Sequence, residues 1–173
     1  MSISSFSSVL ALVKLKLPAS TDKNRISLAK HIVEHKVDLI QLNKHFLFGE
    51  TKMAMRYLWL LTHIGQIDSN QLFNVLPQIL ENWDRINVKN KEASLANYWL
   101  TVGVPIENEG VAIELLFNWL RASYTNETTK SRALKLLVKF SKKYPDIEQE
   151  LKWSLESQKD IKSTSFQKII KTI

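Results

Sequence analysis

The chain has 173 residues, of which 45% are hydrophobic and 24% charged, a composition that argues against intrinsic disorder and suits one folded domain. The absence of cysteine excludes disulfides, thiol catalysis and thiolate zinc sites, and four glycines and four prolines are too few for the tight turns of a β-barrel or β-sandwich. The formal net charge is +7, which predicts a basic surface but does not by itself identify a partner.

The first predicted element is a helix near residues 3–16. Apolar residues from Phe6 to Leu17 recur every three or four positions, as on one face of a helix. The apolar run at 9–13 is short for a signal peptide, and lysines follow it instead of preceding it. We expect this helix to lie on the protein core, with a membrane-surface anchor as the alternative. No apolar stretch approaches the ~18 residues that cross a bilayer, so the sequence predicts a cytoplasmic protein without a membrane partner.

The rest of the chain is also predicted to be helical, with almost no strand signal. The helices are expected near residues 22–35, 38–48, 51–64, 69–84, 90–102, 108–121, 127–143, 146–157 and 163–172. Asp68, Asn108 and Asn126 are predicted N-caps, because their side chains can accept hydrogen bonds from the first-turn N–H groups. Gly65 and Gly103 are predicted to end helices, since glycine adopts the left-handed conformation without a steric penalty.

Aromatic residues recur with a period of nearly forty residues. They are Phe46, Trp83, Trp119 and Trp153, which occupy similar late positions in alternate predicted helices, at separations of 37, 36 and 34. A helix–turn–helix unit of this length cannot bury its apolar face alone, so copies must stack. The period predicts an all-α superhelix (solenoid) of about four helix pairs, with the aromatics filling the seams between pairs. Coincidence within an aromatic-rich helical bundle is the alternative.

Three segments carry a resemblance to a known class of repeats: LFNWL (116–120), SRALKLL (131–137) and DIEQELK (146–152). They are similar to small bacterial HEAT-like proteins of the HEAT/armadillo class, and the resemblance spans residues 20–173. It implies a curved stack of helix pairs, a shape used to hold other macromolecules, and it carries over no individual functional residue. We therefore expect a single domain, residues 1–173, with an N-terminal helix in 1–19, repeats in 20–158 and a C-terminal capping helix in 159–173.

Few residues suggest catalysis. His31, Glu34 and His35 match the spacing H-x-x-E-H, in which two histidines on one helix face bind zinc and the glutamate activates water. Both histidines also border an apolar face, so packing at the edge of the core explains them better. His45 and His63 have no catalytic partner nearby in sequence. The loop Ser-Ser-x-Met-Pro-x-Lys-x-Asn-Pro of adenylosuccinate lyases is also absent, and we expect no enzyme activity, no cofactor and no metal.

Basic residues concentrate toward the C-terminus. Residues 121–173 hold 12 Lys+Arg and 6 Asp+Glu, against 12 and 11 in residues 1–120. One stripe of the helix at 127–143 carries Arg132, Lys135, Lys139 and Lys142, with Lys143 beside it. Such a stripe can follow nucleic-acid phosphates, as basic surfaces do in HEAT-like DNA glycosylases, although those enzymes also need an aromatic-lined pocket with an acidic residue. A solvated, lysine-rich outer face and a surface that binds acidic lipid are the alternatives.

Polar positions on the second helix of each pair would line the concave side of the predicted stack. They are Gln71, Asn74, Gln78, Glu114, Asn118, Arg121 and Lys152. Their mixed charge suits contacts with a protein or peptide better than contacts with phosphate. Simple exposure of these residues to solvent is the alternative. The sequence therefore predicts a non-catalytic scaffold or adaptor that binds a macromolecular partner, with a nucleic-acid-binding module using residues 132–143 as the alternative.

Overall fold

The computed structural model describes residues 6–19, 21–158 and 161–171, and among these it contains helices and no β-strand. The prediction of an all-α protein is confirmed. Contacts gather into two compact units, Met1–Lys91 and Glu92–Ile173. Within the described residues, no helix combines the length and the apolar character needed to cross a membrane.

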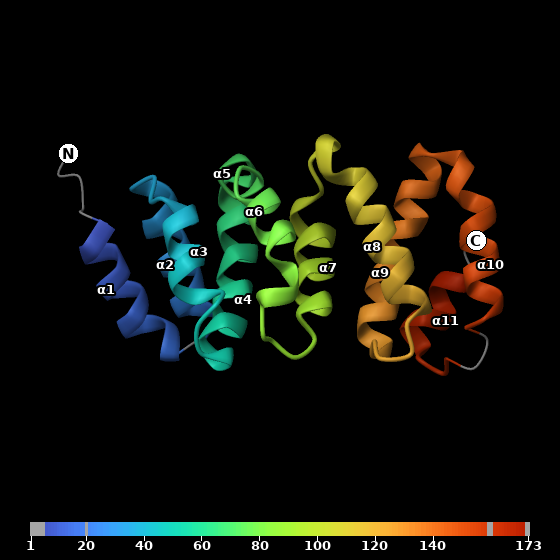
Figure 1. Cartoon of the computed structure of the whole chain (residues 1–173), viewed down its shortest axis with the longest axis horizontal. Coiled ribbons are helices and arrows are strands. Elements are labelled where there is room, and N and C mark those ends of the chain that lie inside the picture. The colour runs from blue at the N-terminus through green and yellow to red at the C-terminus, as the bar shows by residue number, and fades with distance from the viewer. Residues whose placement is uncertain (1–5, 20, 159–160, 172–173) are drawn as a thin grey trace. The chain divides into compact units, whose positions relative to one another are not determined.

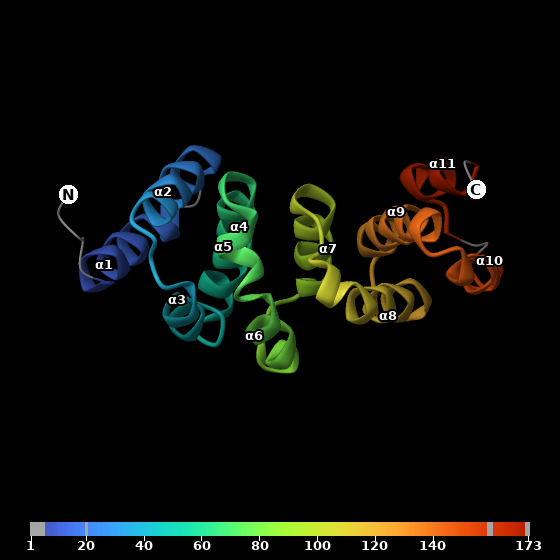
Figure 2. The same cartoon turned by 90° about the horizontal axis from the view of Figure 1, so that it is seen from above.

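The N-terminal unit is built around two long helices packed against each other. Its elements are α1 (Phe6–Lys16), η1 (Leu17–Ala19), α2 (Asp22–Glu34), α3 (Leu39–Phe46), α4 (Thr51–Ile67), α5 (Ser69–Phe73), α6 (Leu76–Glu81) and η2 (Trp83–Arg85) (Figure 1). The most extensive packing in this unit joins α2 to α4. Ile32 of α2 and Leu60 and Ile64 of α4 are fully buried. Seen from above, α2 and α4 form one layer of the unit, and α3 and α6 lie on its other side (Figure 2).

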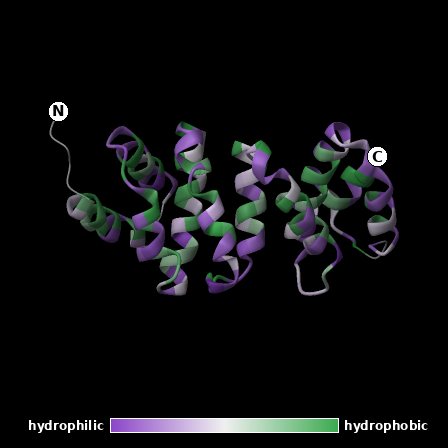
Figure 3. Ribbon diagram, turned by 45° about the horizontal axis from the view of Figure 1, so that its top comes forward, coloured by the Kyte–Doolittle hydropathy of each residue, from purple (hydrophilic) through white to green (hydrophobic). Residues whose placement is uncertain are grey.

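The C-terminal unit also has two layers of helices. Its elements are α7 (Lys91–Val102), η3 (Ile106–Asn108), α8 (Glu109–Arg121), α9 (Glu127–Lys143), η4 (Pro145–Ile147), α10 (Glu148–Glu156) and α11 (Thr164–Ile170). In Figure 2, α7, α9 and α11 form one layer, and α8 and α10 form the other. Helix α9 packs along both α8 and α11, and α10 packs on α8. The helices carry both hydrophobic and hydrophilic residues (Figure 3), because each helix has one side that packs on its neighbours and another that faces solvent.

Two of the three predicted N-caps form. The Asp68 carboxylate accepts hydrogen bonds from the N–H groups of Asn70 and Gln71 at the start of α5, and Asn126 caps α9 by accepting from Thr129 N–H. The prediction for Asn108 was wrong, because its backbone is already helical at the end of η3 and its side chain makes no capping hydrogen bond.

Of the two glycines predicted to end helices, one does so and the other does not. Gly103 follows the last residue of α7 at φ +106°, the left-handed region that glycine reaches without strain, and this prediction is confirmed. Gly65 does not end a helix, because α4 continues past it to Ile67 and the glycine is buried inside that helix.

The helix predicted at 69–84 is three shorter elements, α5, α6 and η2. Pro77 lies in the first turn of α6. Proline lacks a backbone N–H, and its ring clashes with the carbonyl four residues earlier, so a continuous helix through Pro77 is disfavoured. The chain therefore breaks at Asn74 and Val75 and starts again at Leu76.

The periodic aromatics have different environments. Phe46 and Trp119 are buried and stack on Tyr57 and Trp99, with ring centroids 5.2 and 5.8 Å apart. Trp153 is 63% exposed, so the prediction that it fills a seam was wrong. Helix α10 buries Leu151 and Ser154 instead, which lie three residues apart on one face.

Candidate binding surfaces

Of the three partner-binding residues predicted in the N-terminal unit, only Asn74 is exposed. Gln71 is half-buried, and its Nε2 donates to the carbonyl oxygen of Val37 at 3.2 Å. This bond ties α5 to the segment that leads into α3, so the Gln71 amide serves the unit's own packing.

Gln78 belongs to a buried polar network. Its Oε1 accepts a hydrogen bond from Asn43 Nδ2 at 2.9 Å, and Tyr57 Oη donates to Asn43 Oδ1 at 3.0 Å. Burial, with a smaller contribution from the Asp38 carboxylate, raises the pKa of Tyr57 well above its usual value, so its hydroxyl stays protonated and can donate. The network joins α3, α4 and α6. The amides of Gln71 and Gln78 are thus both engaged in packing within the unit.

In the C-terminal unit, three predicted residues share one exposed face of α8. They are Glu114, Asn118 and Arg121, spaced four and three residues apart. Arg121 Nη1 lies 3.0 Å from Glu150 Oε1 on α10, which links the two helices. Lys152 is also exposed, but it pairs with Glu148 at 2.6 Å and, two residues from Glu150, lies on a different side of α10.

The sequence reading missed Trp153 as a surface residue. It follows Glu150 by three positions and is therefore its neighbour on α10, beside the pair with Arg121. An indole that is 63% exposed is unusual, because tryptophan is mostly buried in folded proteins. We call the surface formed by Glu114, Asn118, Arg121, Glu150 and Trp153 the α8–α10 surface.

Two of the five predicted phosphate-binding cations have partners within the unit. Arg132 is half-buried, and its Nη1 donates to the carbonyl oxygen of Ala93 on α7 at 2.6 Å. Lys143 Nζ donates to Glu109 Oε2 at 2.6 Å, and Tyr144 Oη donates to the same oxygen at 2.5 Å. The hydrogen bond with Glu109 raises the pKa of Lys143, so this lysine is held in its charged form where the start of α8 contacts the end of α9.

The other three predicted cations form a row along α9. Lys135, Lys139 and Lys142 are exposed, and none of them takes part in an ion pair with a described residue. Their spacing of four and three residues places them on one side of the helix. We call them the exposed lysine row.

A hollow of about 270 Å³ lies at one end of this row. Its lining residues come from α7, α9 and the start of α11: Asn97, Leu100, Thr128, Ser131, Arg132, Lys135, Ser163 and Ser165. The lining includes two cations and no carboxylate. Sequence reasoning found Arg132 and Lys135 but missed the hydroxyl groups, because Ser163 and Ser165 lie about thirty positions further along the chain and no local pattern connects them. We call this the α9 hollow.

The H-x-x-E-H histidines lie together without further ligands. The rings of His31 and His35 are 4.1 Å apart, and His35 Nδ1 is 2.8 Å from the carbonyl oxygen of His31. Burial, together with the neighbouring His35, lowers the pKa of His31. Within residues 6–19, 21–158 and 161–171, no group of three His, Asp or Glu could hold a metal ion. His45 stacks on Phe6, with ring centroids 6.0 Å apart.

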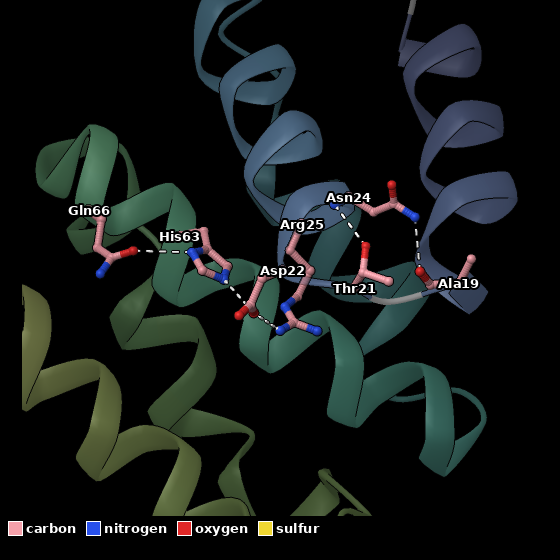
Figure 4. Close-up of polar contacts among 7 residues, drawn as sticks. All are labelled: Ala19, Thr21, Asp22, Asn24, Arg25, His63 and Gln66. Atoms are coloured by element: carbon pink, nitrogen blue, oxygen red, sulfur yellow. Dashed lines mark hydrogen bonds and ion pairs between the residues drawn. The ribbon is translucent and has the colours of Figure 1, made fainter.

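His63 bridges two helices of the N-terminal unit (Figure 4). Its Nδ1 lies 3.1 Å from Gln66 Oε1 on the same helix, and its Nε2 lies 3.9 Å from Asp22 Oδ1 at the start of α2. Asp22 also pairs with Arg25. Both ring nitrogens of His63 thus have neighbours that orient the ring between α4 and α2, as a packing role requires.

Comparison of the chain with protein-family models, with curated proteins and with solved structures gives no match.

Proposed function

We propose that the protein is a non-catalytic scaffold or adaptor that binds a protein partner through the α8–α10 surface. The observation that carries this proposal is the exposure of Trp153. Tryptophan is enriched among the residues that contribute most to protein–protein binding, because its large ring buries much apolar area with few rotatable bonds. The Arg121–Glu150 pair beside it supplies the polar rim that surrounds such an anchor.

We also propose that the helices are arranged as a HEAT-like solenoid of about four pairs. Two features within the units support this. Each unit has two layers of helices, and in the C-terminal unit the consecutive helices α8 and α9 pack along each other while α9 also packs on α11. Stacked pairs of this kind expose one layer along their length, which suits an extended binding surface.

Affinity capture with two aromatic variants tests the adaptor proposal. Trp153→Ala removes the anchor, and Tyr124→Ala is the matched control, because Tyr124 is 75% exposed in the same unit but lies in the loop after α8. The bait is incubated with a lysate of the source cells, half of it treated with nuclease. We expect a protein that survives nuclease treatment, is retained by the wild type and by Tyr124→Ala, and is lost with Trp153→Ala. Equal capture by both variants, or loss of the partner after nuclease treatment, would contradict the proposal.

A second candidate function, nucleic-acid binding, is favoured by the exposed lysine row. Lysines that neutralise phosphates release counterions, so raising the salt from about 50 to about 200 mM should weaken binding to a fluorescent duplex about fortyfold if three phosphates are neutralised. The double variant Lys135→Glu with Lys139→Glu should abolish the duplex binding that remains at the higher salt concentration. Lys23→Glu with Lys30→Glu is the matched control, because these exposed lysines of α2 give the same change in net charge. No binding at low salt, or an equal loss in the control, excludes this function.

A further inference from the structure

We propose that the α9 hollow is a binding site for a phosphate group. The site lies outside the α8–α10 surface and does not depend on the adaptor function. Arg132 and Lys135 both line it, and its lining contains no acidic residue that would repel an anion or neutralise them. A volume of about 270 Å³ is just below the usual range for pockets that hold drug-sized ligands, and it suits a phosphate and part of the group that carries it.

Arg132 is held in position before any ligand arrives. Its hydrogen bond to the carbonyl oxygen of Ala93, at 2.6 Å, fixes the guanidinium against α7. A guanidinium has five N–H donors, so one bond to the backbone leaves others for a ligand, and its planar fork matches two phosphate oxygens. A side chain that is already ordered loses little conformational entropy on binding, which favours affinity.

The hydroxyl groups of the hollow match the remaining oxygens of a phosphate. Thr128, Ser163 and Ser165 line the hollow together with Ser131. Ser131 is 6% exposed, and its buried hydroxyl has no hydrogen-bond partner among the described residues. An unsatisfied buried hydroxyl is unfavourable, and the oxygen of a bound anion would supply the missing acceptor. Several hydroxyl donors around two cations suit a tetrahedral oxyanion better than a planar carboxylate.

The first experiment measures binding of inorganic phosphate by titration calorimetry at low ionic strength. Lys135→Gln removes a cation of the hollow, and Lys139→Gln is the matched control, one turn further along the same exposed side of α9 and outside the lining. We expect saturable binding by the wild type, about tenfold weaker binding by Lys135→Gln, and a change of less than about twofold for Lys139→Gln. No saturable binding by the wild type, or an equal loss in the two variants, would overturn the proposal.

A second variant separates binding from folding. Arg132 is unsuitable because it ties α9 to α7. Ser131→Ala removes a hydroxyl that has no partner in the described structure, so the melting temperature should not fall. We expect phosphate binding to weaken several-fold in this variant. Unchanged phosphate affinity in Ser131→Ala would count against the hollow as the site.

The source of the phosphate is distinguished by two oligonucleotides. A single-stranded oligothymidylate is compared with and without a 5′-phosphate, in the wild type and in Lys135→Gln. A preference for the phosphorylated strand that Lys135→Gln removes identifies a strand end as the source and supports the site. Saturable phosphate binding with no preference between the strands identifies a small phosphorylated compound, and also supports it. Trp153→Ala alters only the α8–α10 surface. The phosphate titration therefore tests the α9 hollow, the capture experiment tests the adaptor proposal, and either proposal can fail without the other.

Discussion

The carboxylate of Glu109 shows how one buried charge is made favourable. Glu109 is the first residue of α8, and the residue is 8% exposed. Burial alone would raise the pKa of Glu109, but the hydrogen bonds from Lys143 and Tyr144, with the Lys143 charge, outweigh it and lower the pKa. The folded state therefore binds the proton less tightly than the unfolded state, whose glutamate titrates near pH 4.3, at about the usual value. The stabilisation is present above this pH and is lost as the pH falls through the folded-state pKa.

We predict that Glu109→Gln lowers the free energy of unfolding by about 1–2 kcal/mol at about pH 7, because the charge-assisted hydrogen bonds are lost. The difference from the wild type should shrink as the pH is lowered below about 4, where the native carboxyl also becomes protonated. Urea unfolding at the two pH values measures it. Glu114→Gln, an exposed change on the same helix, should have little effect at either pH. A difference between Glu109→Gln and wild type that does not depend on pH would refute this account.

The cations of α9 show why the candidate site was only partly predictable. The helical spacing correctly placed Lys135, Lys139 and Lys142 on an exposed side of α9. It could not show that Lys143 meets a glutamate 34 positions earlier or that Arg132 meets a carbonyl 39 positions earlier. Periodicity gives the face of a helix on which a residue lies, whereas its partner depends on which helix packs there.

The two asparagines that precede α8 and α9 should contribute differently to stability, because only one of them caps its helix. Asn126 accepts from Thr129 N–H at 2.8 Å, so Asn126→Ala should destabilise the protein by about 1 kcal/mol. Asn108 makes no capping bond, and its buried Oδ1 has no partner among the described residues, so Asn108→Ala should leave stability unchanged or slightly higher. Thermal and urea unfolding of both variants measure the difference. Equal destabilisation would show that Asn108 also caps its helix.

Helix bounds were predictable where apolar spacing and an end signal agreed. The prediction of 127–143 matches α9, which has Asn126 as its cap and Lys142 and Lys143 in its last turn. The error at 69–84 was avoidable, since Pro77 is visible in the sequence and a proline four residues after Phe73 disfavours a continuous helix. The error at Gly65 was not avoidable from the sequence, because the packing around a glycine decides whether a helix ends there or continues.

At the scale of the whole chain, the prediction of a single domain has a thermodynamic consequence. Each unit has a core of its own, but the boundary between the units falls after the first residue of α7 and not in a flexible linker rich in Pro, Gly or Ser. In stacked repeats, the stability of one element depends on its neighbours. A chain that behaves as one domain should therefore lose the structure of both units in one transition.

We predict that a cavity in the N-terminal unit destabilises the C-terminal unit. Trp59→Phe with Trp83→Phe leaves the tryptophans only at positions 99, 119 and 153, so fluorescence reports the C-terminal unit alone. Leu60 of α4 is fully buried, so adding Leu60→Ala should lower the free energy of unfolding by about 2–5 kcal/mol. The urea midpoint should then fall by about 1–2 M, and by the same amount whether it is measured by fluorescence or by far-UV circular dichroism. Leu134→Ala, fully buried in α9, must lower the fluorescence midpoint in either case and is the control. If Leu60→Ala shifts the urea midpoint measured by circular dichroism but not the one measured by fluorescence, the units unfold independently and the prediction of a single domain is wrong.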